Sequence, residues 1–163
     1  MDWIPRAGIG YDIHRLAPGR RLVLGGVEIL HPRGLEGHSD ADVVAHAIGD
    51  ALLGALALGD LGQHFPPGDP GFKDISSLVL LERIAALLAA RGARIAGVDV
   101  TVVAEAPRLA PHLGEMRACL AAALGLGRER VSVKATTNEG FGAIGRGDAI
   151  AAHAVATVLE PAG

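Results

Sequence analysis

The sequence has few aromatic side chains, which make up 3% of its residues, although 50% of the chain is hydrophobic. Aromatic rings bury more area than other side chains, so a core of alanine, leucine, valine and isoleucine gains little burial from each residue. A chain of 163 residues suits one compact domain and leaves little room for two. We therefore expect a single domain over residues 1–163, in which oligomerisation could supply the missing burial.

Cys119 is the only cysteine, which excludes a disulfide scaffold or a multi-cysteine metal site and fits a reducing cytoplasm. The most apolar stretch, LVLLERIAALLAA, is interrupted by Glu82 and Arg83, well short of the roughly 20 residues that span a bilayer. We expect no secretory leader, no membrane insertion and a cytoplasmic location. The net charge is -3 and no Lys/Arg run is present, so we expect a small-molecule partner and no nucleic acid.

Strand-like and helix-like segments alternate along the chain, with Gly and Pro at the turns. This order predicts an α/β or α+β fold in which helices pack against a mixed sheet. The last strand carries small apolar residues on both faces and should be buried on both. The expected elements are a strand over 6–16, a hairpin turning at Gly25-Gly26, a helix over 39–57, a Gly/Pro-rich loop over 59–74, a helix over 76–90, a strand over 94–106, a helix over 112–124, and strands over 131–137 and 149–159.

Two polar patterns converge on a possible metal site. Asp12 and His14 alternate on the first strand, so both side chains point to one face. Asp42, His46 and Asp50 recur every four residues and form one stripe on a helix. With His46 as the third ligand, Asp12 and His14 would leave a fourth position open, as catalytic zinc sites do. The alternative is that a lone helical histidine is simply packed or exposed.

The other residues of the stripe have simpler interpretations. Ser39 and Asp42 have the spacing of a capping box, which predicts that the helix begins at Ser39. Asp42 is then a helix-start carboxylate that complements the helix dipole. Asp50 is either an exposed charge or, as we prefer, the partner that orients His46.

The segment KATTNEGFGAIGRGD combines hydroxyls, backbone amides and charged side chains. Its glycines match G-x-G-x-x-G, but only residues 146–163 follow Gly145, too few to complete a dinucleotide-binding fold. Lys134, Glu139 and Arg146 suit phosphate groups and a hard cation. The alternative is a polar hairpin whose glycines serve turn geometry.

Read together, the blocks GYDIHRL, GHSDADVVAHAIGDALLGALALGDLGQHFP, DVTVVAEAPRLAPH and VKATTNE…GRGD closely resemble the 2-C-methyl-D-erythritol 2,4-cyclodiphosphate synthase family, from about Arg6 to Leu159. The resemblance implies a homotrimer whose sheets face the threefold axis, with active sites between neighbouring subunits. Two positions depart from the family. Ala143 stands where an aromatic residue is usual, although Phe141 could partly substitute, and Asp148 replaces the more usual Glu. The ligand of the central channel is therefore left open.

The resemblance also implies roles for individual residues. Zinc, or a similar divalent cation, would be held by Asp12, His14 and His46, and magnesium or manganese by Glu139. His38 and Thr137 would act in catalysis by donating hydrogen bonds to developing charge. Substrate contacts would come from Asp12, His14, His38, Ser39, Asp60, Gly62, the loop from Phe65 to Asp69, Ala104, Ala106, Pro107, Arg108, Leu109, Ala110, Thr136, Thr137, Glu139 and Arg146, with Ala104 to Ala110 lining the cytidine pocket from the neighbouring subunit.

The implied reaction converts 4-diphosphocytidyl-2-C-methyl-D-erythritol 2-phosphate into the 2,4-cyclodiphosphate and CMP, in non-mevalonate isoprenoid biosynthesis. Its nucleophile is a phosphate anion, which agrees with our finding no Ser-His-Asp or Cys-His arrangement in the sequence. Two alternatives remain: a zinc-dependent phosphate ester hydrolase and a non-catalytic binding trimer stabilised by metal.

Overall fold

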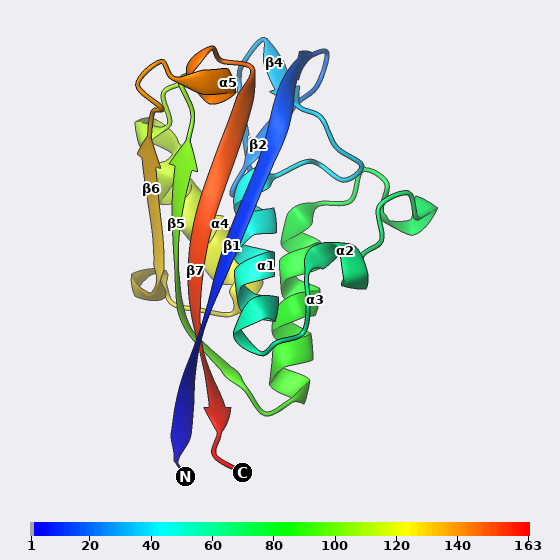
Figure 1. Ribbon diagram of the computed structural model, residues 1–163, viewed down its shortest axis with the longest axis vertical. Coiled ribbons are helices and arrows are strands. Elements are labelled where there is room, and N and C mark those ends of the chain that lie inside the picture. Colours follow the sequence, from blue (N-terminus) through cyan, green and yellow to red (C-terminus); the bar gives the residue numbers. More distant parts are fainter. Residues whose placement is uncertain (1) are drawn as a thin grey trace.

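The computed structural model describes residues 2–163, which form a five-stranded sheet with three longer helices against one face (Figure 1). The strand order is β4-β1-β7-β5-β6, and β2 and β3 form a separate hairpin. β5 and β6 pair in parallel and the other pairs are antiparallel, which confirms the predicted mixed sheet. The elements are β1 (Trp3–Pro18), β2 (Leu22–Leu24), β3 (Val27–Ile29), β4 (Arg33–Leu35), α1 (Val43–Ala55), α2 (Leu61–His64), α3 (Ser77–Ala90), β5 (Arg94–Val103), α4 (Leu113–Leu124), β6 (Val131–Thr136), α5 (Gly142–Gly145), β7 (Ala149–Pro161) and 3-10 turns at Pro70–Phe72, Ala110–His112 and Arg128–Arg130.

Helix α1 lies directly on β1 because two glycines leave the strand bare on that side. A Cβ atom on Gly10 would lie 1.8 Å from the carbonyl oxygen of Ala47, and one on Gly8 would lie 2.0 Å from that of Ala51. Any side chain at either position would push the helix away from the sheet. This contact brings the first turns of α1 over the part of β1 that follows Gly10.

Alternation along β1 sorts its residues onto two faces. Even-numbered residues from Gly8 to His14 face α1, whereas Ile9, Tyr11 and Ile13 point away and are 81%, 52% and 40% exposed. Val155 of β7 is paired with Ile9 and is 48% exposed. The prediction that the last strand is buried on both faces is therefore wrong for the isolated chain, because within residues 2–163 the longer helices cover only the opposite face (Figure 1).

Helix α1 begins at Val43 with Asp42 as its N-cap, so the predicted start at Ser39 is wrong. The buried Asp42 carboxylate accepts four backbone N–H groups at 2.7 to 3.1 Å, two from the first turn of α1 and two from the predicted Gly25–Gly26 turn, which is thereby confirmed. Burial and the neighbouring Asp40 raise the pKa of Asp42 to about 6, while these N–H groups favour the carboxylate. Asp42 is the predicted helix-start carboxylate, and it also ties the β2–β3 hairpin to α1.

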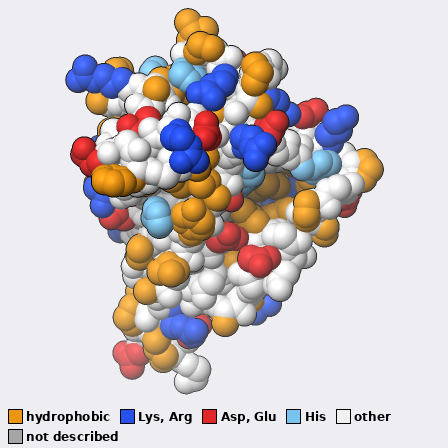
Figure 2. All heavy atoms as spheres, turned by 45° about the horizontal axis from the view of Figure 1, so that its top comes forward, with side chains coloured by type: hydrophobic (Ala, Val, Ile, Leu, Met, Phe, Trp, Pro, Cys, Tyr) orange, Lys and Arg blue, Asp and Glu red, His pale blue; other side chains and the backbone are white. Residues whose placement is uncertain are grey.

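The remaining boundaries follow local backbone geometry. α1 ends at Ala55, short of the predicted Ala57, because Ala57 turns the chain with a left-handed φ of 56°. α3 and α4 end as predicted, and Gly125 closes α4 with a φ of 67°. No helix in residues 2–163 is long and apolar enough to cross a membrane. On the face that Figure 2 shows, basic and acidic side chains are interspersed, with no large patch of one sign.

The substitution Asp42→Asn should lower the free energy of unfolding by about 2 to 3 kcal/mol, because its amide group would point a donor at buried N–H donors. Urea unfolding at pH 8, above the pKa of Asp42, measures the effect. Asp60→Asn is the matched control, since Asp60 caps the exposed α2 through one bond to the Gln63 N–H and asparagine caps equally well. Equal stability of the two variants would contradict the role of Asp42.

Candidate metal centre and substrate site

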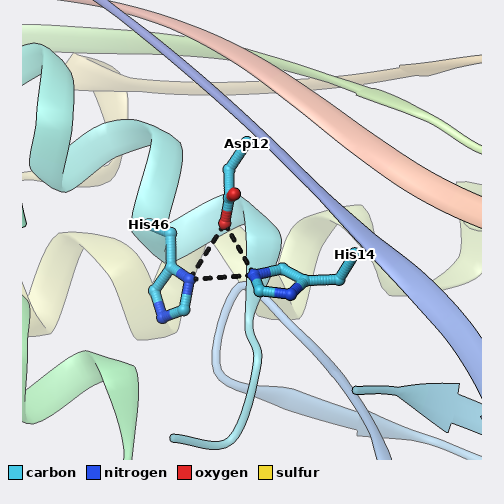
Figure 3. A group of neighbouring side chains, drawn as sticks. All are labelled: Asp12, His14 and His46. Carbon is cyan, nitrogen blue, oxygen red and sulfur yellow. Dashed lines mark hydrogen bonds and ion pairs between the residues drawn. The ribbon is translucent and has the colours of Figure 1, made fainter. Parts of the chain in front are cut away.

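Asp12, His14 and His46 converge on one point between β1 and α1 (Figure 3). Asp12 Oδ2 lies 2.8 Å from His14 Nε2 and 2.9 Å from His46 Nδ1, and the two ring nitrogens are 3.3 Å apart. Alternation on β1 supplies the first two side chains, and the glycine-mediated contact of α1 with β1 supplies the third. The structure thus brings together the three residues that the sequence predicts as ligands.

The chemistry of this cluster fits a divalent cation. Two ring nitrogens and a carboxylate oxygen are donors that zinc takes in proteins, and one ligand atom of each residue lies within 4.8 Å of the other two. Burial disfavours the charge of Asp12, but hydrogen bonds from both rings outweigh it and hold the pKa of Asp12 well below its usual range. Burial would lower the pKa of His46, yet Asp12 outweighs it and raises that pKa. Asp12 thus stays a carboxylate, which is the form that ligates a cation.

The far side of the His46 ring meets two hydroxyls rather than Asp50. His46 Nε2 lies 2.9 Å from Ser77 Oγ and 3.1 Å from Ser39 Oγ. Asp50 is half-buried, has a pKa raised by burial, and accepts the Leu61 N–H at 2.8 Å. Our preferred interpretation, that Asp50 orients His46, is therefore wrong. Sequence reasoning missed Ser77, because a serine at a helix start is expected to be a cap, and here Ser76 is that cap.

Two adjoining pockets open beside the cluster, of about 320 and 200 Å³, and His14 and His46 line both. The larger one runs toward α2, and the smaller one lies between the start of α1 and the loop over 65–72. Besides Asp12 and His14, five predicted substrate-binding residues line these pockets: Asp60, Gly62, His38, Ser39 and Phe65.

Asp69 contributes through its backbone. His38 Nε2 donates a hydrogen bond to the carbonyl oxygen of Asp69 at 2.7 Å, and the Asp69 carboxylate accepts the Gly71 N–H at 2.9 Å. The loop therefore orients the His38 ring at the mouth of the smaller pocket.

A second group of predicted residues gathers where β5 and β6 end side by side. The two strands are parallel, so Ala104 to Ala110 leave the sheet next to the loop after β6, and the Ala104 N–H donates to the carbonyl oxygen of Thr136 at 3.0 Å. Glu139 in that loop has a left-handed φ of 51°. Glu105 Oε1 accepts the N–H groups on both sides of it, from Asn138 at 2.8 Å and from Gly140 at 3.3 Å. Glu105 lies within the predicted segment from Ala104 to Ala110, but the sequence did not predict its contact with the Glu139 loop.

The two groups stay apart within the described chain. β7 and β5 separate β1 from β6, which places β6 about 14 Å from β1 across three strand spacings. Neither pocket beside the metal cluster is lined by Ala104 to Ala110 or by Thr136 to Glu139.

Arg146 lines a third pocket, which His14 also lines, but it lines neither of the two pockets described above. Its Nε lies 3.2 Å from Asp148 Oδ2, and Ala143 and Ile13 also line this third pocket of about 510 Å³.

Comparisons with known proteins agree with this geometry. Residues 5–159 match the model of the YgbB family. The chain is 60% identical over 155 residues to the 2-C-methyl-D-erythritol 2,4-cyclodiphosphate synthase of Gloeobacter violaceus, covering 95% of each chain. A solved structure of such a synthase in a CDP-bound form has a TM-score of 0.85 and 36% identity, covering 93% of this chain and 98% of that one. The CDP complex of IspF from Plasmodium falciparum has a TM-score of 0.83 and 31% identity, covering 98% of this chain and 97% of that one.

The substitution His46→Ala should weaken zinc binding by about 100-fold or more, because it removes one of three protein ligands while β1 and α1 keep their glycine contact. Competition with a chromophoric chelator gives the affinity. His112→Ala is the control, since His112 lies in the turn before α4, outside the cluster. Unchanged zinc affinity in His46→Ala would contradict the ligand assignment.

Proposed function

The chain belongs to the YgbB family of 2-C-methyl-D-erythritol 2,4-cyclodiphosphate synthases. From that premise we propose that it forms 2-C-methyl-D-erythritol 2,4-cyclodiphosphate and CMP from the cytidine diphosphate precursor in isoprenoid biosynthesis. The 2-phosphate oxygen forms a bond to the β-phosphorus, and the bond from that phosphorus to the oxygen of CMP breaks. The observation that carries the proposal is the Asp12, His14 and His46 cluster beside the pockets at the start of α1 and at α2.

This reaction needs no side-chain nucleophile, although the structure contains an arrangement that resembles one. Ser77, His46 and Asp12 are linked in order at 2.9 Å and 2.9 Å, which corrects our expectation that the chain holds no Ser-His-Asp arrangement. Ser77 is only 1% exposed and its hydroxyl donates to Asp40, so its oxygen cannot reach a substrate. The substrate's own phosphate is the nucleophile.

We assign zinc to Asp12, His14 and His46, and magnesium or manganese to Glu139. Bound there, such cations polarise the phosphoryl oxygens as Lewis acids and offset the repulsion between the two phosphate groups. The side chains provide positioning, which together with electrostatic stabilisation accounts for most of the catalysis in phosphoryl transfer. His14 and His46 line both pockets, so a phosphate that spans the pockets would lie against the cluster.

The residues around the smaller pocket suit a phosphate group. Ser39 lines the smaller pocket just before the N-terminus of α1. The dipole of the helix favours an anion there, although Asp42 already accepts the N–H groups of Val44 and Ala45. The Ser39 oxygen accepts the Ala41 N–H at 3.2 Å, which leaves the hydroxyl proton to donate. His38 lines the same pocket, and because its Nε2 donates to Asp69, Nδ1 is the ring atom left to contact a ligand. We assign to Ser39 Oγ and His38 Nδ1 the support of charge that develops on the phosphoryl oxygens.

We further propose a homotrimer whose subunits pack through the sheet face of Ile9, Tyr11, Ile13 and Val155. Two observations support it. This face leaves large apolar side chains in water although they belong to the longest strands of the sheet. In addition, the metal cluster and the Glu139 group lie on separate parts of the chain. A neighbouring subunit would place its own Glu139 group beside each metal cluster.

The geometry of Glu139 supports its role as the magnesium ligand. A left-handed backbone at a non-glycine residue costs roughly 1 to 3 kcal/mol and persists where its surroundings hold it. Glu105 holds it by accepting the N–H groups on either side. We assign cytidine binding to the adjoining segment from Ala104 to Ala110. Thr136 and Thr137 are the residues that we propose to contact phosphate.

Phosphorus NMR of the purified protein with the cytidine diphosphate substrate tests the function. We expect stoichiometric CMP and a cyclic diphosphate that lacks the 2-phosphate monoester resonance. A linear bisphosphate product would favour the zinc hydrolase, and no turnover in a zinc-loaded trimer would favour the non-catalytic binding protein. Either result contradicts the proposal.

The substitution Ile9→Arg should dissociate the trimer, because a buried unpaired charge costs several kcal/mol at each interface. Light scattering should then give a mass near the 16.6 kDa of one chain, against three times that mass for the wild type. Leu30→Arg is the matched control, since Leu30 follows β3 and is 100% exposed. A trimer that survives Ile9→Arg would place the interface elsewhere.

The substitution Glu139→Gln should lower the rate by about 100-fold or more and weaken its response to magnesium, because the carboxylate is removed while the side-chain shape is kept. Zinc content and trimer mass should not change. The measurement is rate against magnesium concentration, and saturation curves that coincide with the wild type would show that Glu139 is not the ligand.

A further inference from the structure

The ring of His46 is held from the side opposite the metal cluster. Its Nδ1 faces Asp12 and His14, and its Nε2 lies 2.9 Å from Ser77 Oγ. Ser77 is the first residue of α3 and is 1% exposed, so water does not compete for this contact. A buried hydroxyl in contact with a ring nitrogen must either donate to it or accept from it.

Asp40 decides the direction of that hydrogen bond. The Ser77 hydroxyl lies within hydrogen-bond distance of Asp40 Oδ1, and the Ser77 N–H donates to Asp40 Oδ2 at 2.9 Å. An ionised carboxylate only accepts, so the single hydroxyl proton of Ser77 goes to Asp40. Ser77 must then accept from His46, which places a ring proton on Nε2, so that Nδ1 is the ring atom left to ligate a cation in the cluster.

Asp40 is itself held between two helices. Its Oδ1 accepts the Asp42 N–H at 3.1 Å at the start of α1, and its own N–H donates to the carbonyl oxygen of Ile75 at 3.1 Å before α3. The orientation of the His46 ring therefore follows from the packing of the start of α1 against the start of α3.

We propose that Asp40 and Ser77 are positioning residues for the metal site: Asp40 orients the Ser77 hydroxyl, and Ser77 holds His46 in the tautomer and rotamer that present Nδ1 as a ligand. Groups that hydrogen-bond to a metal-bound histidine affect both affinity and ligand orientation. The inference rests on the proposed metal site and adds two residues to it.

The arrangement also gives the two serines beside His46 different roles. The proton of Ser77 is committed to Asp40, whereas Ser39 Oγ accepts from Ala41 and lies 3.1 Å from His46 Nε2. Ser39 lines the smaller pocket, so its proton is available to a ligand there. Ser77 therefore orients the His46 ring, and Ser39 can donate a hydrogen bond to a ligand in the pocket.

The test compares Ser77→Ala with Ser76→Ala, which removes a neighbouring hydroxyl of the same helix start. Ser76 Oγ accepts the Leu78 N–H and has no contact with His46, so it controls for loss of helix capping. Zinc affinity from chelator competition should fall by about 10- to 100-fold in Ser77→Ala and stay within about twofold in Ser76→Ala. In the zinc-loaded protein, the NMR signal of the His46 Nε2 proton should move upfield and exchange faster with water only in Ser77→Ala.

A second variant tests whether Asp40 acts through Ser77. Asp40→Asn should weaken zinc binding in the wild-type background and add little in the Ser77→Ala background, because the hydroxyl that it orients is then absent. It also keeps the proposal testable if Ser77→Ala fails to fold. If Ser77→Ala kept the wild-type zinc affinity and an unchanged Nε2 proton signal, Ser77 would not be a positioning residue. If the losses of zinc affinity were additive in the double variant, Asp40 would not act through Ser77. Failure of the wild type to bind zinc would overturn the metal site itself.

Discussion

The close contact between α1 and β1 is the constraint on which the rest of the structure depends. Gly8 and Gly10 let the helix backbone rest on the strand backbone, so His46 reaches Asp12 and His14 without a long side chain. The buried Asp42 carboxylate then fixes where the helix begins and links it to the β2–β3 hairpin. The site is therefore built on rigid elements, as a cation with strict ligand distances requires.

A single chain supplies only part of the proposed active site. The metal cluster and its pockets lie along β1 and α1, whereas Glu139 and the segment from Ala104 to Ala110 lie at the ends of β5 and β6. The sheet face of Ile9, Tyr11 and Val155 is apolar and exposed on the isolated chain. Assembly through that face would remove its apolar surface from water. The same contact between subunits would also complete each active site.

Sequence reasoning succeeded where a backbone period controls the outcome. The two-residue period of a strand paired Asp12 with His14, and the helical period placed His46 on the face that meets them. It failed where the outcome depends on packing between distant segments. Asp50 lies one turn from His46 but bonds to Leu61, and the ring meets Ser77, 31 residues away along the chain. The capping-box spacing misplaced the helix start because Asp42 had a better set of donors in the distant Gly25–Gly26 turn.

The central claim, that each active site combines residues from two subunits, is tested most directly by mixing two inactive variants. His46→Ala lacks a proposed zinc ligand and Glu139→Gln lacks the proposed magnesium ligand, so each homotrimer should fail to cyclise the substrate. Trimers formed from a 1:1 mixture of the denatured chains should recover about a quarter of the wild-type activity, because one interface in four joins two intact halves. Mixed trimers that are well folded but remain inactive would contradict the account.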